Sequence, residues 1–140
     1  MTRQTLTIPI VLAVVVVPAL AQAPNLRPGK YEITAQMESP GMKMRPHKGT
    51  QCITAEQLKD VSKAFRDREM EKECKVSDVK VDGNKVTFRT TCKQDGIEAI
   101  GNTEVTLGTD SYTALVTTKD NKGHTMTITQ NAKRIGECTK

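Results

Sequence analysis

The residues of this chain best suited to chemistry are two methionines and a histidine in one short segment. Met42, Met44 and His47 offer two thioethers and an imidazole, which are ligands that Cu(I) accepts in proteins. Three basic residues stand among them and would repel a cation, whereas methionine is also an adaptable contact at binding surfaces. We therefore expect a loop that contacts an apolar ligand or a protein partner. The alternative hypothesis is a periplasmic copper site at Met42, Met44 and His47.

Catalytic motifs are absent from the sequence. It has two histidines and contains no G-x-S-x-G nucleophile turn, no H-E-x-x-H zinc motif and no glycine-rich phosphate loop after a predicted strand. Glu98, Glu104 and Asp110 fall on exposed strand positions or in turns, and their spacing brings no two of them into one pocket. The sequence therefore predicts a protein that is not an enzyme and that needs no cofactor.

The N-terminus has the three parts of a secretion signal. Arg3 supplies a positive charge, an apolar run follows from residue 8 to residue 17, and small residues lead to Ala21. This run is too short for a membrane-spanning helix, which needs about 20 residues. We expect cleavage after Ala21, a mature chain without a transmembrane anchor, and a periplasmic or secreted location in a bacterium.

Four cysteines are spread along the mature chain, at Cys52, Cys74, Cys92 and Cys138, with no C-x-x-C pair among them. Exported proteins meet an oxidising environment, where separated cysteines form disulfides far more often than zinc sites. The chain has no tryptophan and only two tyrosines and two phenylalanines. Covalent cross-links therefore compensate for a core with little aromatic bulk.

One domain is expected for residues 22–140, because a smaller unit would bury too little surface to be stable. The formal net charge is +5, and the basic residues are scattered along the chain. Nucleic-acid binding requires a basic stripe interleaved with aromatic side chains. The sequence has no such stripe, and we expect no nucleic-acid partner.

Alternation of apolar and polar residues dominates the body of the chain and predicts strands. They are expected at residues 31–37, 51–53, 75–81, 86–92, 97–107, 112–118 and 124–135. Thr54 and Gln57 form a capping box that starts a helix near residues 55–70. Short turns between the later strands indicate an antiparallel meander of about six to seven strands, curled or barrel-like. Met37 and Met126 are in phase with the buried faces of their strands.

The pairing of the cysteines is suggested by the hairpin between residues 75 and 92. If Val81 lies opposite Val86, the apolar parity of the incoming strand slips before Val79, which indicates a β-bulge near Ser77 and Asp78. The bulge places Cys74 opposite Cys92 and leaves Cys52 for Cys138. The pairs Cys52–Cys74 and Cys92–Cys138 are the main alternative.

Several short motifs together resemble those of one protein family, DUF3617, a domain of unknown function in small exported bacterial proteins. They are Pro28-Gly29-Lys30-Tyr31-Glu32, the Pro40-Gly41-Met42 loop, Gln51-Cys52-Ile53-Thr54, the hairpin from Cys74 to Cys92, and Arg134-Ile135-Gly136-Glu137-Cys138. Tyr31 stands where this family usually has tryptophan. The resemblance implies a secreted or periplasmic protein with disulfides, and it supplies no catalytic residues.

The predicted signal gives a direct test. When the full chain is expressed in a bacterium, the exported protein is expected to begin at Gln22, because the small residues that end at Ala21 fit a signal peptidase. Intact mass and N-terminal sequencing of the envelope fraction measure this. An uncleaved N-terminus in that fraction would contradict the prediction.

Overall fold

The computed structural model describes residues 25–65 and 72–139. The predicted secretion signal, Met1 to Ala21, therefore lies outside the described residues. No helix in the described part of the chain combines the length and the apolar character that a membrane crossing requires.

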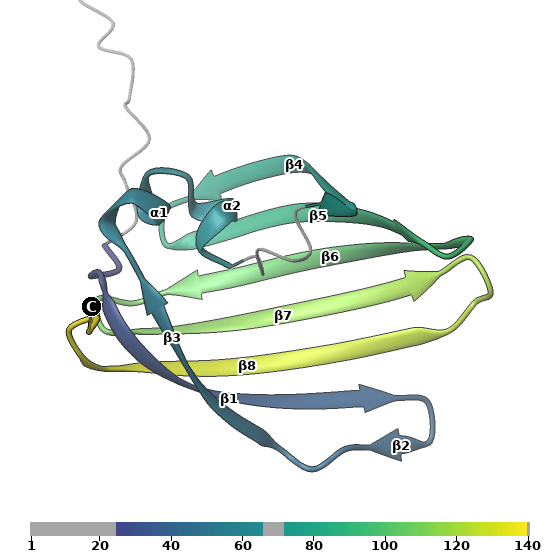
Figure 1. Cartoon of the computed structure of the whole chain (residues 1–140), viewed down its shortest axis with the longest axis horizontal. Helices are drawn as coiled ribbons and strands as arrows, with labels where there is room; N and C mark the ends of the chain where they lie inside the picture. The colour runs from purple at the N-terminus through teal and green to yellow at the C-terminus, as the bar shows by residue number, and fades with distance from the viewer. Residues whose placement is uncertain (1–24, 66–71, 140) are drawn as a thin grey trace, which may run out of the picture.

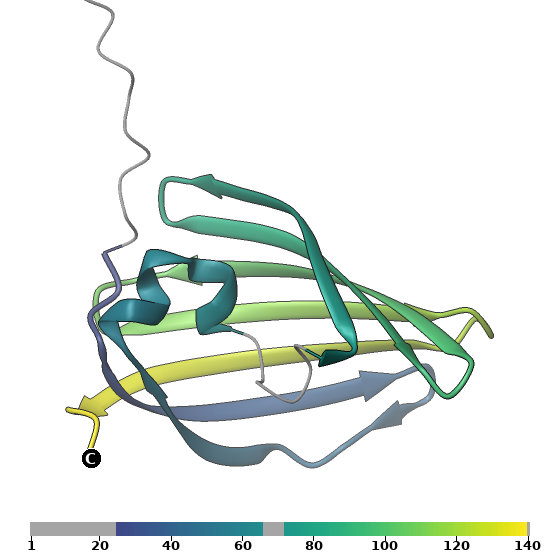
Figure 2. The same cartoon turned by 45° about the horizontal axis from the view of Figure 1, so that its top comes forward.

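Eight antiparallel strands form one sheet that curls over two short helices (Figures 1 and 2). The strands are β1 (Gly29–Ser39), β2 (Met42–Lys43), β3 (His47–Ile53), β4 (Cys74–Asp82), β5 (Lys85–Gln94), β6 (Ile97–Leu107), β7 (Ser111–Asp120) and β8 (Thr125–Gly136). Their order is β2-β1-β8-β7-β6-β5-β4, with β3 also paired to β1. The sheet is thus a meander from β4 to β8 whose last strand returns to pair with β1.

The predicted curled antiparallel meander is confirmed, and the structure adds two details that the sequence left open. The sheet has eight strands because Met42 and Lys43 pair with Ser39 and Glu38 as an additional short strand. The sheet is not closed into a barrel: among the described strands, β4 pairs only with β5, and β3 pairs only with β1. Two edges are therefore left open, one on each side.

The predicted bulge is present in β4. Val81 lies opposite Val86 and Cys74 lies opposite Cys92, while the register shifts between Ser77 and Lys80. Asp78, inside the shift, has a positive φ of 54°, a conformation that aspartate tolerates better than most residues. The extra residue restores the apolar parity of β4, as its sequence requires.

The predicted helix is shorter than expected and is interrupted. It consists of α1 (Ala55–Lys59) and α2 (Val61–Ala64), separated by Asp60 in an extended conformation. The capping box between Thr54 and Gln57 is present. The Ser62 hydroxyl donates a hydrogen bond of 2.6 Å to the Asp60 carboxylate, a local contact that competes with continued helix. The remainder of the predicted helix, residues 66–71, lies outside the described residues.

The core lies where the helices meet the sheet. Its largest fully buried side chains are Tyr31, Tyr112, Ile53, Val86 and Val105. The Tyr112 ring packs against the Tyr31 ring, with 5.8 Å between the ring centroids, and it meets the Phe65 ring edge-on, with 4.8 Å between the centroids. Gln51 also donates a hydrogen bond of 3.0 Å to the carbonyl of Ala64, which holds α2 over this end of the sheet.

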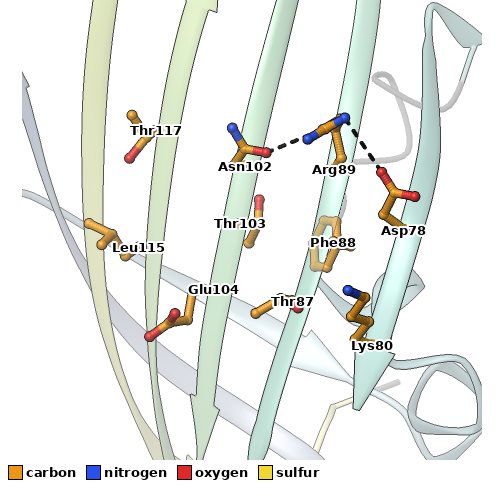
Figure 3. Close-up of a pocket in the computed structure, with 10 residues that line it drawn as sticks. All are labelled: Asp78, Lys80, Thr87, Phe88, Arg89, Asn102, Thr103, Glu104, Leu115 and Thr117. Atoms are coloured by element: carbon orange, nitrogen blue, oxygen red, sulfur yellow. Dashed lines mark hydrogen bonds and ion pairs between the residues drawn. The ribbon is translucent and has the colours of Figure 1, made fainter. Parts of the chain in front are cut away.

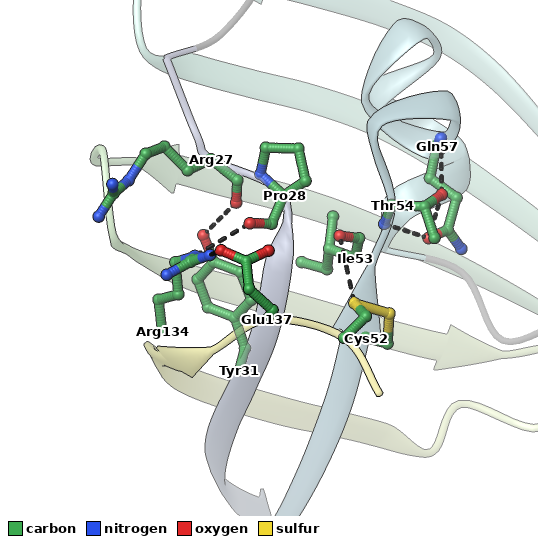
Figure 4. Close-up of a disulfide and its surroundings, with 10 residues drawn as sticks. Arg27, Pro28, Tyr31, Cys52, Ile53, Thr54, Gln57, Arg134 and Glu137 are labelled. Atoms are coloured by element: carbon green, nitrogen blue, oxygen red, sulfur yellow. Dashed lines mark hydrogen bonds and ion pairs between the residues drawn. A yellow bond between two sulfur atoms is a disulfide. The ribbon is translucent and has the colours of Figure 1, made fainter. Parts of the chain in front are cut away.

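The segment before β1 is fastened to the same end of the sheet (Figure 4). The Arg27 guanidinium donates two hydrogen bonds to the Asp110 carboxylate, at 2.7 and 2.8 Å. The Tyr31 hydroxyl donates to the Arg27 carbonyl at 2.6 Å, and Arg134 donates to the Pro28 carbonyl at 2.9 Å. The start of β1 is therefore tied both to the β6–β7 turn and to β8.

Both tyrosines are core residues, so their ionisation reports on folding. Burial raises the pKa of Tyr112 to about 12 and also raises the pKa of Tyr31, where the nearby Arg134 partly opposes it. Unfolded tyrosines ionise near pH 10. The contribution of the neutral, buried tyrosines to the free energy of unfolding is therefore expected to be fully present below about pH 10 and to be lost as the pH rises toward about 12.

Phenolate absorbance measures this directly, because the chain has two tyrosines and no tryptophan. The native protein is expected to titrate above pH 10, and the protein in guanidinium is expected to titrate near pH 10. Identical curves in the two conditions would contradict the buried positions of Tyr31 and Tyr112.

Gly29 allows β1 to approach β8 closely, and this predicts a sensitive position. A Cβ atom there would lie 2.6 Å from the carbonyl oxygen of Gly136 and closer still to the Arg134 side chain, and the glycine φ is +154°. Gly29→Ala is expected to lower the free energy of unfolding by about 1–3 kcal/mol, as overpacking does. Chemical denaturation measures it. Gly49→Ala is the control, since nothing lies within 4 Å of the added methyl, and an equal loss in both variants would contradict the prediction.

Candidate functional site

Two rows of side chains cross the concave face of the sheet, from the edge of the core at Phe88 and Val76 to β1 and β8. Residues directly opposite each other on antiparallel strands project to the same face, so the strand register defines each row. The first row is Met37, Ile128, Val116, Thr103 and Phe88. The second row is Met126, Thr118, Gly101, Thr90 and Val76. We call these ten residues the distal rows.

Burial within the distal rows falls from β5 and β6 toward β1 and β8. Phe88, Thr103 and Gly101 are buried, whereas the other seven residues are only half-buried. The helices cover the opposite end of this face, where α2 lies against β5 and Phe65 reaches Tyr112. The described helices therefore leave the concave surface over β7, β8 and β1 partly exposed.

The distal rows contain no charged residue. Six of the ten are apolar, three are threonines and one is glycine. Neighbouring positions on the same strands face the convex side, and they include Arg89 and Glu104, both exposed. An accessible, largely apolar, concave surface with a few hydroxyl groups has the composition of a site for a lipophilic ligand.

A depression of about 410 Å³ lies on the other face of the sheet, the convex side of β4 to β7 (Figure 3). Its central cation is Arg89, whose guanidinium lies 3.5 Å from the Asp78 carboxylate and donates to the Asn102 side chain at 3.4 Å. Glu104 also lines the depression, and its carboxylate lies 3.1 Å from the ammonium group of Lys85. These charges satisfy one another, and the depression is a less suitable site than the distal rows.

The segment with Met42, Met44 and His47, predicted as a loop, forms parts of two strands. Met42 lies in β2 opposite Ser39, and His47 opens β3 opposite Ala35. These positions are four residues apart along β1, which separates them by about 13 Å. The backbone of Met44 donates to the Met37 carbonyl at 3.0 Å. The structure thus places Met44 beside the distal rows and spreads Met42 and His47 along the sheet edge.

The strand character of this segment was missed because its sequence does not alternate. All of the side chains of residues 42–48 are exposed, so no buried face marks the strand. Backbone pairing with β1, rather than side-chain burial, makes residues 47–50 extended.

Met37 and Met126 occupy the predicted face but not the core. Each is half-buried and stands in a distal row. Alternation identifies the face of a strand, but it does not tell which part of that face the helices cover. For the same reason, alternation could not identify Val116, Thr118 or Gly101 as members of a candidate site.

The remaining polar candidates take part in local structure. Glu98, Glu104 and Asp110 form ion pairs with Lys93, Lys85 and Arg27 respectively. Within residues 25–65 and 72–139, no three His, Cys, Asp or Glu side chains form a group that could hold a metal ion.

His124 binds Asp120 across the β7–β8 turn. Its Nδ1 lies 2.8 Å from the Asp120 carboxylate. This hydrogen bond, together with those from the backbone N–H groups of His124 and Lys122, lowers the pKa of the Asp120 carboxyl. The pair therefore stabilises the turn.

Two disulfides border the fold at opposite ends. Cys52 is joined to Cys138, and Cys74 is joined to Cys92, which is the first of the two predicted arrangements. Figure 4 shows the Cys52 bridge beside the start of β1. The Cys74–Cys92 bridge stands two residues beyond Val76 and Thr90, so it fixes β4 next to the second distal row.

Comparison with known proteins places the chain in a family. No curated protein and no solved structure matches it. The model of one family, described as "Protein of unknown function (DUF3617)", matches residues 26–138, a span that includes every strand and both disulfides. The chain belongs to the DUF3617 family.

Proposed function

We propose that this protein is exported to the bacterial envelope and binds an apolar ligand on the distal rows without transforming it. The observation that carries the proposal is the partly exposed, uncharged strip over β7, β8 and β1, where Val116, Ile128 and Met37 remain half-buried. An apolar surface that a folded chain leaves accessible usually serves an interaction.

The shape of the strip favours a long flexible ligand over a protein surface. The first row crosses five strands, β1, β8, β7, β6 and β5, and its partly exposed part over β7, β8 and β1 spans two strand spacings, or roughly 10 Å. This is the length scale of an acyl chain. Such a chain can follow a curved apolar surface more closely than a rigid partner can, which increases the apolar area that binding removes from water.

The chemistry along the strip supports binding rather than catalysis. Its polar groups are the hydroxyls of Thr103, Thr118 and Thr90, which can orient a ligand by hydrogen bonds but lack an adjacent base within the distal rows. The two disulfides are those of a protein made for an oxidising compartment. Both features fit an envelope protein that holds a lipophilic molecule.

Neighbouring residues on β7 provide the test. Val116 belongs to the first distal row, whereas Leu115 faces the convex side and is 45% exposed. Val116→Gln is expected to weaken binding of the apolar fluorophore N-phenylnaphthylamine about tenfold, because it removes an apolar contact and buries an amide. Leu115→Gln is expected to leave binding unchanged. Fluorescence titration, with a long-chain fatty acid as competitor, measures both.

Thermal unfolding of the two variants separates binding from stability. If Val116→Gln is folded and still binds the fluorophore as tightly as the unchanged protein, the distal rows are not the site. Failure of the fatty acid to displace the fluorophore would likewise contradict the proposal.

A further inference from the structure

An apolar and basic tip extends from one corner of the sheet. It comprises residues 42–48, from β2 to the start of β3, and all of its side chains are exposed. Met42 is 60% exposed and Met44 is 45% exposed, a large fraction for side chains that water solvates poorly. Figure 1 shows β2 at the end of the sheet away from the helices and the C-terminus.

The charge of the tip is positive. Lys43 forms an ion pair of 2.9 Å with Glu38, so this pair is neutral. In the described part of the chain, neither Arg45 nor Lys48 forms an ion pair, and His47 stands between them. Arg45 and Lys48, which have no ion pair in the described part of the chain, thus follow the exposed Met42 and Met44.

The tip also borders the open part of the concave face. The backbone of Met44 is hydrogen-bonded to Met37, a member of the first distal row, at 3.0 Å. Met42 lies opposite Ser39, which has the same parity on β1 as Met37, so Met42 lies on the concave side of the edge. The Gln36 side chain donates a hydrogen bond to the Met44 carbonyl, which fixes the tip against β1.

From these features we infer that the tip docks on an anionic lipid bilayer. Exposed apolar side chains enter the interface between headgroups and acyl chains, while Arg and Lys beside them meet lipid phosphates. Neither feature alone is specific, but their alternation over seven residues matches the chemistry of such a surface. Docking through Met42 and Met44 turns the uncovered end of the distal rows toward the bilayer. The inference goes beyond the proposed ligand site and does not depend on it.

Vesicle binding tests the inference with the purified, oxidised protein. It is expected to co-sediment with vesicles of phosphatidylglycerol and phosphatidylcholine, to bind pure phosphatidylcholine weakly, and to dissociate as salt is added, because surface charges are screened. Arg45→Gln with Lys48→Gln is expected to weaken binding to the anionic vesicles about twentyfold, since each basic residue near the surface contributes roughly fivefold. Met42→Ser with Met44→Ser is expected to weaken it as well.

The matched control is Lys75→Gln with Lys133→Gln, which removes the same net charge from exposed positions on β4 and β8. Full vesicle binding by this control, together with loss in the tip variant, supports the inference. Equal loss in both would overturn it, as would the absence of binding by the unchanged protein at low salt.

The Val116→Gln variant of the ligand site distinguishes the two proposals. Val116→Gln is expected to bind vesicles normally even where it loses the apolar fluorophore. If Val116→Gln loses vesicle binding and the tip variant keeps it, the bilayer contact lies on the distal rows and the tip is not the docking site.

Discussion

Pairing of β1 with β8 is the constraint on which the rest of the structure depends. It brings the first described strand beside the last one, with Tyr31 opposite Arg134 and Met37 opposite Ile128. Because consecutive strands twist in one direction, a meander that must also meet its own beginning curls over one face. The Cys52–Cys138 bridge stabilises this arrangement, since it links β3 to the segment after β8 across 86 residues and restricts the unfolded chain.

A small supply of bulky side chains decides how the curled face is filled. The two tyrosines and Phe65 gather at the end covered by α1 and α2. Beyond them the concave face is lined by Val116, Ile128 and methionines that no described helix covers. A chain of this size can pack one end of the curl to protein density. The other end is left partly exposed, and the proposed ligand site lies there.

Charged side chains are distributed differently on the two faces of the sheet. The convex face holds paired residues such as Arg89 with Asp78 and Lys85 with Glu104, and these contribute little to stability because they are exposed. The concave face between its two ends is uncharged. At the tip, Arg45 and Lys48 form no ion pair in the described part of the chain, and they share a seven-residue segment with the exposed Met42 and Met44. Apolar and basic groups thus meet at the corner where the concave surface opens.

Local sequence patterns determined most of the strands, the turns and the bulge in β4, and they favoured the observed disulfide pairing over its alternative. The parity slip before Val79 was sufficient to place Cys74 opposite Cys92, because alternation has a period of two and a single extra residue shifts it. Only the tertiary structure decided that the sheet stays open, that residues 47–50 join β1, and that Met37 and Met126 lie outside the core. Those outcomes depend on where the short helices dock and which strand edges meet. Alternation along a strand predicts neither the docking of the helices nor the pairing of strand edges. It indicates the face on which each side chain lies and not what covers that face.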